Sequence, residues 1–301
     1  MNQERNYIVM QCYGSPPIFH ECTYALLSLS RLYSASELAH TEIWLYTDNP
    51  GWFRSLKKCT LPLHYREIDA ATIKQWRGRI DFVHRVKVEA LKDFVKGRTG
   101  NIIYLDTDVV ITHRLDKVWR QIEAGALYMH VMEGYVHDAG NAVMAKLNKY
   151  LTANDKTIDG KPLNSFAMWN AGVLGFNTRH SELLDEVLAF TDNEYPHFAK
   201  HIIEQFAFSV SLGRQEAIKA AAPCIMHYWN LKEARKALAD FFDHFSNESW
   251  GTLAAYAPLI QMHVLMQEKV NFLHNRSIVD KLRGKKWHPA PQNWERLINQ
   301  V

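Results

Sequence analysis

Short apolar runs alternate with longer amphipathic stretches through the first half of the chain. The apolar runs have the length of buried strands, and the amphipathic stretches have the length of helices: strands at 7–12, 42–47 and 63–68, helices at 19–33 and 82–95. Strand–helix alternation of this kind predicts an α/β fold with a mostly parallel central sheet flanked by helices on both faces. In such sheets, ligands collect beyond the carboxyl ends of the strands.

The next apolar run, 101–111, is interrupted by two carboxylates. It reads Asn-Ile-Ile-Tyr-Leu-Asp-Thr-Asp-Val-Val-Ile, and we predict one buried strand that presents Asp106 and Asp108 on the same side. Buried carboxylates without a positive partner are costly, and two hard oxygens suit a divalent cation. A solvated turn and an unrelated Ca²⁺ site are the alternatives, and the apolar flanks argue against the turn.

The second half of the chain has a different pattern. We predict a strand at 126–131 and then a polar, irregular segment at 133–165 with an exposed loop at 155–162. A second strand, entered through a small-residue turn, is expected at 166–177, and two helices at 181–191 and 202–212. Beyond residue 229 the pattern is mostly helical. The expected organisation is therefore one main domain over 1–230 and a helical C-terminal extension over 231–301, which packs on the domain or forms an acceptor-facing or membrane-facing surface.

Composition narrows the class of protein. With 301 residues, 47% of them hydrophobic, the chain can bury one large core, and a net charge of +3 gives no reason to expect a nucleic-acid partner. The four cysteines are scattered without a C-x-x-C pair, which suits a reduced compartment. Without an apolar run of about 20 residues or a signal-peptide pattern at the start, we expect a cytoplasmic protein.

Four sequence elements carry a family resemblance. Residues 104–110, Tyr-Leu-Asp-Thr-Asp-Val-Val, resemble the D-x-D strand of nucleotide-sugar glycosyltransferases with the Rossmann-like GT-A fold. Residues 169–177, beginning Trp-Asn-Ala-Gly, resemble the N-A-G strand of the retaining glycogenin and lipopolysaccharide galactosyltransferase type. Glu204-Gln205 is similar to that group's Asp-Gln pair, and His227 falls where its late metal-binding histidine is expected. The resemblance covers roughly residues 8–228.

The resemblance implies a metal site and a catalytic pair. Asp106, Asp108 and His227 would bind Mn²⁺ or Mg²⁺ on the diphosphate of the donor. Gln205 would lie beneath the anomeric carbon and stabilise its positive charge, which gives retention of configuration. If Glu204 faces the donor instead, it would act as a general base and give inversion, so both residues are candidate catalytic residues.

The resemblance also implies a set of donor-binding residues. Lys87 would reach the phosphate or the sugar, with Arg85 as the competing cation on the same helix and a surface charge as the alternative role. Thr107 lies between the two aspartates and joins this set. The small segment Asn170-Ala171-Gly172 would let the backbone approach the sugar closely, or it would serve only as a tight structural turn.

Two positions depart from the family pattern. The family usually has an aspartate or asparagine after the first strand to hold the base, whereas this chain has Gln11-Cys12-Tyr13. Tyr13 is expected to stack on the base and Gln11 to hydrogen-bond it. The glycine and the lysine–proline segment that normally follow the late histidine are replaced, and Lys232 alone can stand in as a phosphate ligand.

Together these features predict a metal-dependent glycosyltransferase that moves a hexose from a UDP-sugar to a hydroxyl of a glycan, lipid-linked or protein acceptor, with retention. The alternatives are a haloacid-dehalogenase-type phosphatase and a non-catalytic GT-A carbohydrate-binding relative. A haloacid-dehalogenase-type phosphatase shares the D-x-D motif but needs a later acidic motif such as Gly-Asp, which the chain lacks. A basic run near the end of the chain predicts either a solvated face or peripheral contact with the inner face of a membrane: Arg276, Lys281, Arg283, Lys285 and Lys286.

Overall fold

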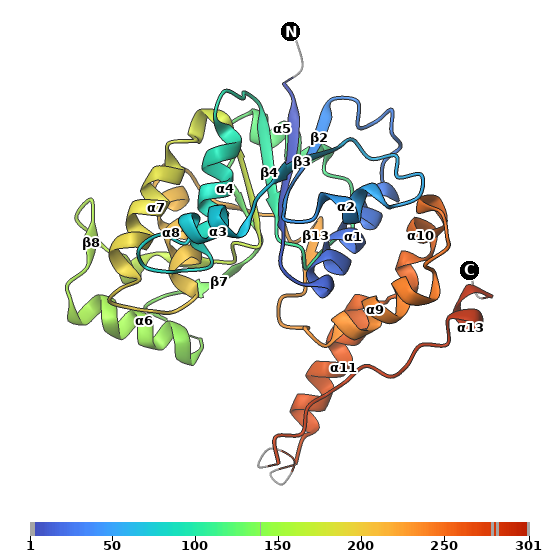
Figure 1. Cartoon of the computed structure of the whole chain (residues 1–301). Coiled ribbons are helices and arrows are strands. Elements are labelled where there is room, and N and C mark those ends of the chain that lie inside the picture. The colour runs from blue at the N-terminus through green and yellow to red at the C-terminus, as the bar shows by residue number, and fades with distance from the viewer. Residues whose placement is uncertain (1–3, 139, 278–279, 281–282, 300–301) are drawn as a thin grey trace.

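A seven-stranded sheet forms the centre of the molecule (Figure 1). The computed structural model describes residues 4–138, 140–277, 280 and 283–299. The strand order is β12-β6-β11-β4-β1-β2-β3, and only β11 runs antiparallel to its neighbours. The strands are β1 (Asn6–Cys12), β2 (Thr41–Thr47), β3 (Leu63–Glu67), β4 (Asn101–Leu105), β6 (Tyr128–Met129), β11 (Val173–Asn177) and β12 (Lys219–Ala220). The mostly parallel sheet expected from the sequence is therefore confirmed.

Helices cover both faces of this sheet, because successive strand residues point to opposite sides. Ile8 and Met10 of β1 join one core cluster, and Tyr7 and Val9 join the other. The first face is covered by α1 (Pro16–Ser30), α2 (Pro50–Arg54) and α5 (Asp116–Glu123), and α9 (Ala234–His244) and α10 (Trp250–Tyr256) pack against α1. The second face is covered by α3 (Ala70–Trp76), α4 (Arg85–Val95), α7 (Leu183–Glu194) and α8 (Ile202–Gln215), with the short helix η2 (Thr178–His180) preceding α7.

The run 101–111 is not the single strand that its apolar residues predict. It divides into β4 of the main sheet and β5 (Val109–Ile111), which pairs antiparallel with β13 (Ile225–His227) in a separate two-stranded sheet. Residues 106–108 form the non-strand connection between them. The expectation that an extended backbone places both aspartates on one side is therefore wrong, and their convergence has another cause.

The polar segment 133–165 is more regular than expected. It contains β7 (Met132–Tyr135), α6 (Ala142–Ala153), the hairpin of β8 (Thr157–Ile158) and β9 (Lys161–Pro162), and the short helix η1 (Leu163–Ser165). The segment 166–177 is likewise two strands, β11 and β10 (Ala167–Trp169), and β10 pairs with β7. Met144, Leu147 and Leu151 bury one face of α6 in a third core cluster, and this helical spacing was the signal that the polar residues obscured.

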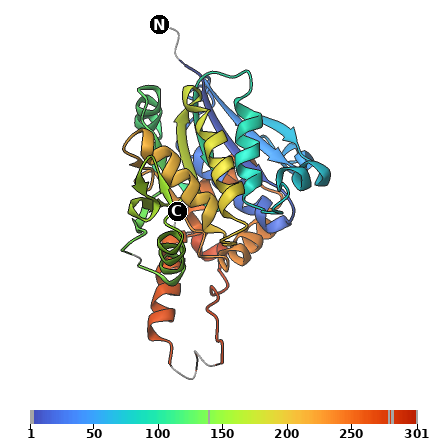
Figure 2. The same cartoon turned by 90° about the vertical axis from the view of Figure 1, so that its left-hand side faces the viewer.

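The first part of the C-terminal segment packs on the main body, while α11 (Met262–Asn275) extends away from it (Figures 1 and 2). The Tyr24 hydroxyl of α1 donates to the Ile260 carbonyl at 2.9 Å, and Arg235 of α9 forms a two-armed ion pair with the buried Glu21. In the part of the chain that the sequence predicts to be mostly helical, α10 is followed at once by a short 3-10 helix that contains Pro258. The elements here are η3 (Ala257–Leu259), α11 (Met262–Asn275) and α13 (Trp294–Ile298).

The basic run lies at the far end of α11 and in the segment that returns toward α13. Arg276 donates to the Lys285 carbonyl at 3.0 Å, and Lys285 lies 3.6 Å from the Asp280 carboxylate. Lys281 lies outside the described residues. Among the residues that are described, no helix combines the length and apolar character needed to cross a membrane. Membrane contact through this run and a domain boundary at residue 230 stay predictions.

Candidate active site

The sheet topology brings three distant segments to the carboxyl end of β4. Because β11 runs antiparallel to β4, its first residue, Val173, pairs with Leu105, the last residue of β4. The turn before β11 therefore lies beside Asp106, whose amide donates to the Gly172 carbonyl at 2.8 Å. On the other side of the connection, His227 pairs with Val109 and so lies beside Asp108.

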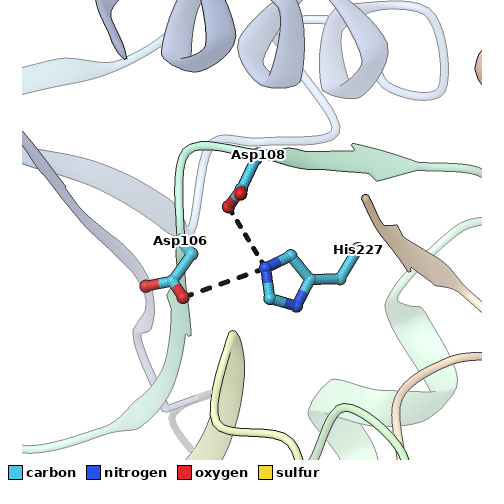
Figure 3. A group of neighbouring side chains, drawn as sticks. All are labelled: Asp106, Asp108 and His227. Carbon is cyan, nitrogen blue, oxygen red and sulfur yellow. Dashed lines mark hydrogen bonds and ion pairs between the residues drawn. The ribbon is translucent and has the colours of Figure 1, made fainter. Parts of the chain in front are cut away.

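Asp106, Asp108 and His227 point toward a common centre (Figure 3). Each offers one ligand atom, and these atoms lie within 4.8 Å of one another. His227 Nε2 is 3.1 Å from Asp108 Oδ1 and 3.9 Å from Asp106 Oδ2. Asp108 and His227 are buried, and Asp106 is half-buried. The metal-ligand set expected from the sequence is thus assembled as a possible divalent metal site.

Hydrogen bonds fix the tautomer of His227. Asn170 Nδ2 donates to the Glu133 carboxylate at 3.1 Å, so Asn170 Oδ1 faces the other way and accepts from Gly172 N at 3.0 Å. The same Oδ1 lies 2.8 Å from His227 Nδ1, which must therefore carry the proton. Nε2 is then the ring nitrogen that faces the carboxylates and is available to a metal cation. Two hard oxygens and one imidazole nitrogen fit Mn²⁺ or Mg²⁺.

Lysines flank both aspartates on the sides that face away from His227. Lys232 Nζ lies 2.6 Å from Asp108 Oδ2, and Lys87 Nζ lies 3.3 Å from Asp106 Oδ1. Burial would raise the pKa of Asp108, but the adjacent His227 ring and the Lys232 ammonium outweigh it and hold that pKa well below its usual range. Asp108 therefore stays ionised and available to a cation.

Lys87 is a buried cation, not the surface charge considered as an alternative. Its side chain donates to the Ala171 carbonyl at 3.0 Å, and its Nζ lies 3.2 Å from Glu204 Oε1. Burial lowers the pKa of Lys87, but Asp106 and Glu204 more than offset this, so the pKa lies above its usual value. Arg85, the competing cation, is held instead by Asp192 at 2.7 and 3.1 Å.

The adjacent residues Glu204 and Gln205 of α8 have different environments. Glu204 is only 3% exposed, and burial raises its pKa to about 7 although the Lys87 ammonium opposes the shift. Gln205 is half-buried, and its Nε2 donates to Glu133 Oε2 at 2.9 Å. Glu133 therefore connects Gln205 to Asn170, a role that the sequence reasoning missed because both partners are distant in the chain.

Gly172 makes room for the imidazole. A Cβ at this position would lie 2.1 to 2.7 Å from three atoms of the His227 ring, so no larger residue fits without displacing it. The sequence suggested that small residues here let the backbone approach a sugar. The structure gives Gly172 a further reason to be small, which is the close packing of His227 against the turn.

Every site residue predicted from the sequence lines one pocket of about 830 Å³. They are Gln11, Tyr13, Lys87, Asp106, Thr107, Asp108, Asn170, Ala171, Gly172, Glu204, Gln205, His227 and Lys232. The pocket wall also includes residues that the sequence reasoning did not select: Ile18, Val83, His84, Glu133, Asn141, Ala142, Val143, His201, Ile202 and Trp229. The grouping is a fact of the fold, whereas the individual roles stay predictions.

Solved structures with a similar fold are glycosyltransferases. No protein-family model and no curated protein matches the sequence. The glycosyltransferase GlyE of Streptococcus pneumoniae aligns with a TM-score of 0.50 and 16% identity over 87% of this chain and 64% of GlyE. This chain has the fold of GlyE. The GT-A type of α/β fold expected from the sequence is thereby confirmed, and the chain spans about two thirds of the length of GlyE.

Two further glycosyltransferase structures align less closely. Mouse xyloside xylosyltransferase 1 gives a TM-score of 0.47 and 15% identity over 71% of this chain and 84% of that protein. The galactosyltransferase LgtC, in complex with donor and acceptor sugar analogues, gives a TM-score of 0.45 and 12% identity over 71% of this chain and 73% of LgtC.

Proposed function

We propose that the chain is a metal-dependent glycosyltransferase that transfers a hexose from a UDP-sugar to a hydroxyl acceptor with retention of configuration. The observation that carries this proposal is the convergence of Asp106, Asp108 and His227 at the carboxyl end of β4, inside a pocket of about 830 Å³. The fold shared with GlyE supports the same class of protein.

Asp106, Asp108 and His227 would hold Mn²⁺ or Mg²⁺. When bound, the ion supplies Lewis-acid stabilisation of the negative charge that gathers on a diphosphate leaving group. Lys232 lies at the pocket with half of its side chain exposed, so it can exchange its contact with Asp108 for a phosphate oxygen. Lys87, buried among its partners, holds Asp106 and the Ala171 carbonyl in place.

Gln205 is the better candidate to face the anomeric carbon. Its Nε2 is held by Glu133, so Oε1 is the end of the amide that is left for a developing positive charge. Glu204 is buried and lies in an ion pair with Lys87, which disfavours it as the free general base that inversion requires. In this proposal, Glu204 is a structural partner of Lys87.

In the proposed transfer, no covalent bond forms between the sugar and the protein. The bond between the anomeric carbon and the β-phosphate oxygen breaks, and its electron pair leaves with UDP. The acceptor hydroxyl oxygen attacks the same face of the sugar, and its proton passes to the departing phosphate. Gln205 and Glu133 lie beneath the sugar, where an amide oxygen and a carboxylate stabilise the positively charged transition state.

The base and the acceptor are assigned to opposite parts of the pocket wall. Gln11 Oε1 is buried without a partner among the residues that the structure describes, and it suits an N–H of uracil, with Tyr13 beside it as a stacking surface. The acceptor is placed against the wall residues Asn141, Ala142 and Val143, near the half-exposed Trp229. Within the described chain, no pocket-lining residue lies beyond Lys232, so α9, α10, α11 and α13 are not part of this wall.

A donor panel tests the proposal. Purified protein is incubated with UDP-, GDP- and TDP-sugars in Mn²⁺ or in EDTA, and nucleotide release is followed by chromatography. We expect release from one UDP-sugar that needs Mn²⁺ and is lost in Asp108→Asn, whereas Asp192→Asn, which loses the ion pair to Arg85 outside the pocket, keeps it. Binding without any release would favour the non-catalytic relative. A product with inverted anomeric configuration in proton NMR would contradict retention.

A further inference from the structure

Each aspartate of the candidate metal site has one oxygen occupied by the protein itself. The Tyr104 hydroxyl donates to Asp106 Oδ1 at 2.8 Å, and Lys87 Nζ lies 3.3 Å from the same atom. On the second aspartate, Lys232 Nζ lies 2.6 Å from Asp108 Oδ2. The oxygens that remain, Asp106 Oδ2 and Asp108 Oδ1, are the two that face His227.

Of these partners, Tyr104 is the most deeply buried. It is fully buried on β4, two residues before Asp106, and its ring packs among the helices of the second face of the sheet. The Lys87 ammonium lies 5.3 Å from the centre of that ring. Lys232, by contrast, is 51% exposed and can leave Asp108 when a ligand arrives. Asp106 is therefore held in one orientation whether or not a ligand is present.

We propose that Tyr104 is a positioning residue that restricts Asp106 to a single ligand oxygen and so favours Mn²⁺ and Mg²⁺ over Ca²⁺. Mg²⁺ takes six ligands in near-ideal octahedral geometry, whereas Ca²⁺ takes six to eight oxygens and often binds both oxygens of a carboxylate. A carboxylate with one oxygen held by a hydroxyl and an ammonium cannot easily provide both. The inference rests on the proposed metal site and specifies which ions that site selects.

A matched pair of variants tests the role of Tyr104. Tyr104→Phe removes only the hydroxyl, and Phe fills the same buried space. Tyr46→Phe is the control, because Tyr46 is also buried and its hydroxyl donates to Asp93 at 3.0 Å, away from the pocket. Mn²⁺ binding is measured on each protein by electron paramagnetic resonance, with Mn²⁺ alone and then with increasing Ca²⁺ as competitor.

We expect Tyr104→Phe to weaken Mn²⁺ binding about 10-fold, as loss of an outer partner of a metal ligand commonly does. The amount of Ca²⁺ needed to displace Mn²⁺ should fall several-fold further, and Tyr46→Phe should match the wild type in both measurements. Unchanged Mn²⁺ affinity in Tyr104→Phe, or an equal loss for both ions, would overturn the inference. Absence of Mn²⁺ binding to the wild type would instead remove the metal site and, with it, the proposed function.

Discussion

Lys87→Met is the most informative perturbation of the site that leaves the proposed metal ligands in place. Lys87 is 3% exposed and lies between the carboxylates of Asp106 and Glu204, at 3.3 and 3.2 Å. Methionine has a similar length and apolar stem but no charge. The variant therefore leaves two carboxylates, one of them fully buried, without their shared cation, and leaves the Ala171 carbonyl without its donor.

The loss of stability in Lys87→Met comes from the two carboxylates that are left without a cation. Removing one partner of a buried ion pair typically lowers the free energy of unfolding by about 3–5 kcal/mol. Unfolding entropies of about 2.1 cal/mol/K per residue give roughly 0.6 kcal/mol/K for a chain of 301 residues. The melting temperature of Lys87→Met should therefore fall by roughly 5–8 °C when it is measured in EDTA near pH 8.

Scanning calorimetry with two companion variants makes the test specific. Lys92→Met is the control on the same helix, because Lys92 pairs with the largely exposed Asp185 and its loss should shift the melting temperature by only about 1 °C. Adding Glu204→Gln to Lys87→Met should recover part of the loss, since it removes one of the two unpaired charges. A fall of less than about 2 °C in Lys87→Met would refute the view of Lys87 as the shared cation.

Two further variants test neighbouring parts of the site. Gly172→Ala would place a methyl group 2.1 to 2.7 Å from three atoms of the His227 ring and so displace the ring. The variant should lose Mn²⁺ binding in electron paramagnetic resonance and keep the far-ultraviolet circular dichroism of the wild type. Mn²⁺ affinity equal to that of the wild type would contradict this packing. Glu204→Gln tests the pKa of about 7 for Glu204. Because folding raises this pKa, ionisation of Glu204 destabilises the wild type as pH rises from about 4.5 through 7. Between about pH 5 and pH 8, the free energy of unfolding of the variant should therefore rise by up to about 3 kcal/mol relative to that of the wild type. A stability difference that is independent of pH would argue against that raised pKa.

The sequence brought together residues that line one pocket, but it predicted the local structure around them less well. The alternation of strands and helices indicated the sheet and its carboxyl edge, and motif order selected Asp106, Asn170, Gln205 and His227, which all line one pocket. The reason given for the convergence of the aspartates was nevertheless wrong. They meet in a connection between two sheets, because β5 leaves the main sheet to pair with β13. An apolar run does not reveal with which strand each half of it will pair.

Long-range hydrogen bonds account for what the sequence could not supply. Glu133 contacts Gln205 and Asn170, residues 72 and 37 positions away, so no local spacing marks it. Tyr104 was visible only as an apolar residue of the D-x-D strand, although its hydroxyl holds Asp106. The helix α6 was missed because polar, turn-rich residues precede and follow it, so the whole segment 133–165 was interpreted as irregular.

The most direct test of the central claim is an anomalous difference map from crystals soaked with MnCl₂ and UDP, collected at the manganese absorption edge. We predict one strong peak at about 2.0–2.3 Å from Asp106 Oδ2, Asp108 Oδ1 and His227 Nε2, with the diphosphate of UDP beside it. A peak elsewhere, or UDP bound in the pocket with no manganese between these three side chains, would contradict the proposed metal-dependent transferase site.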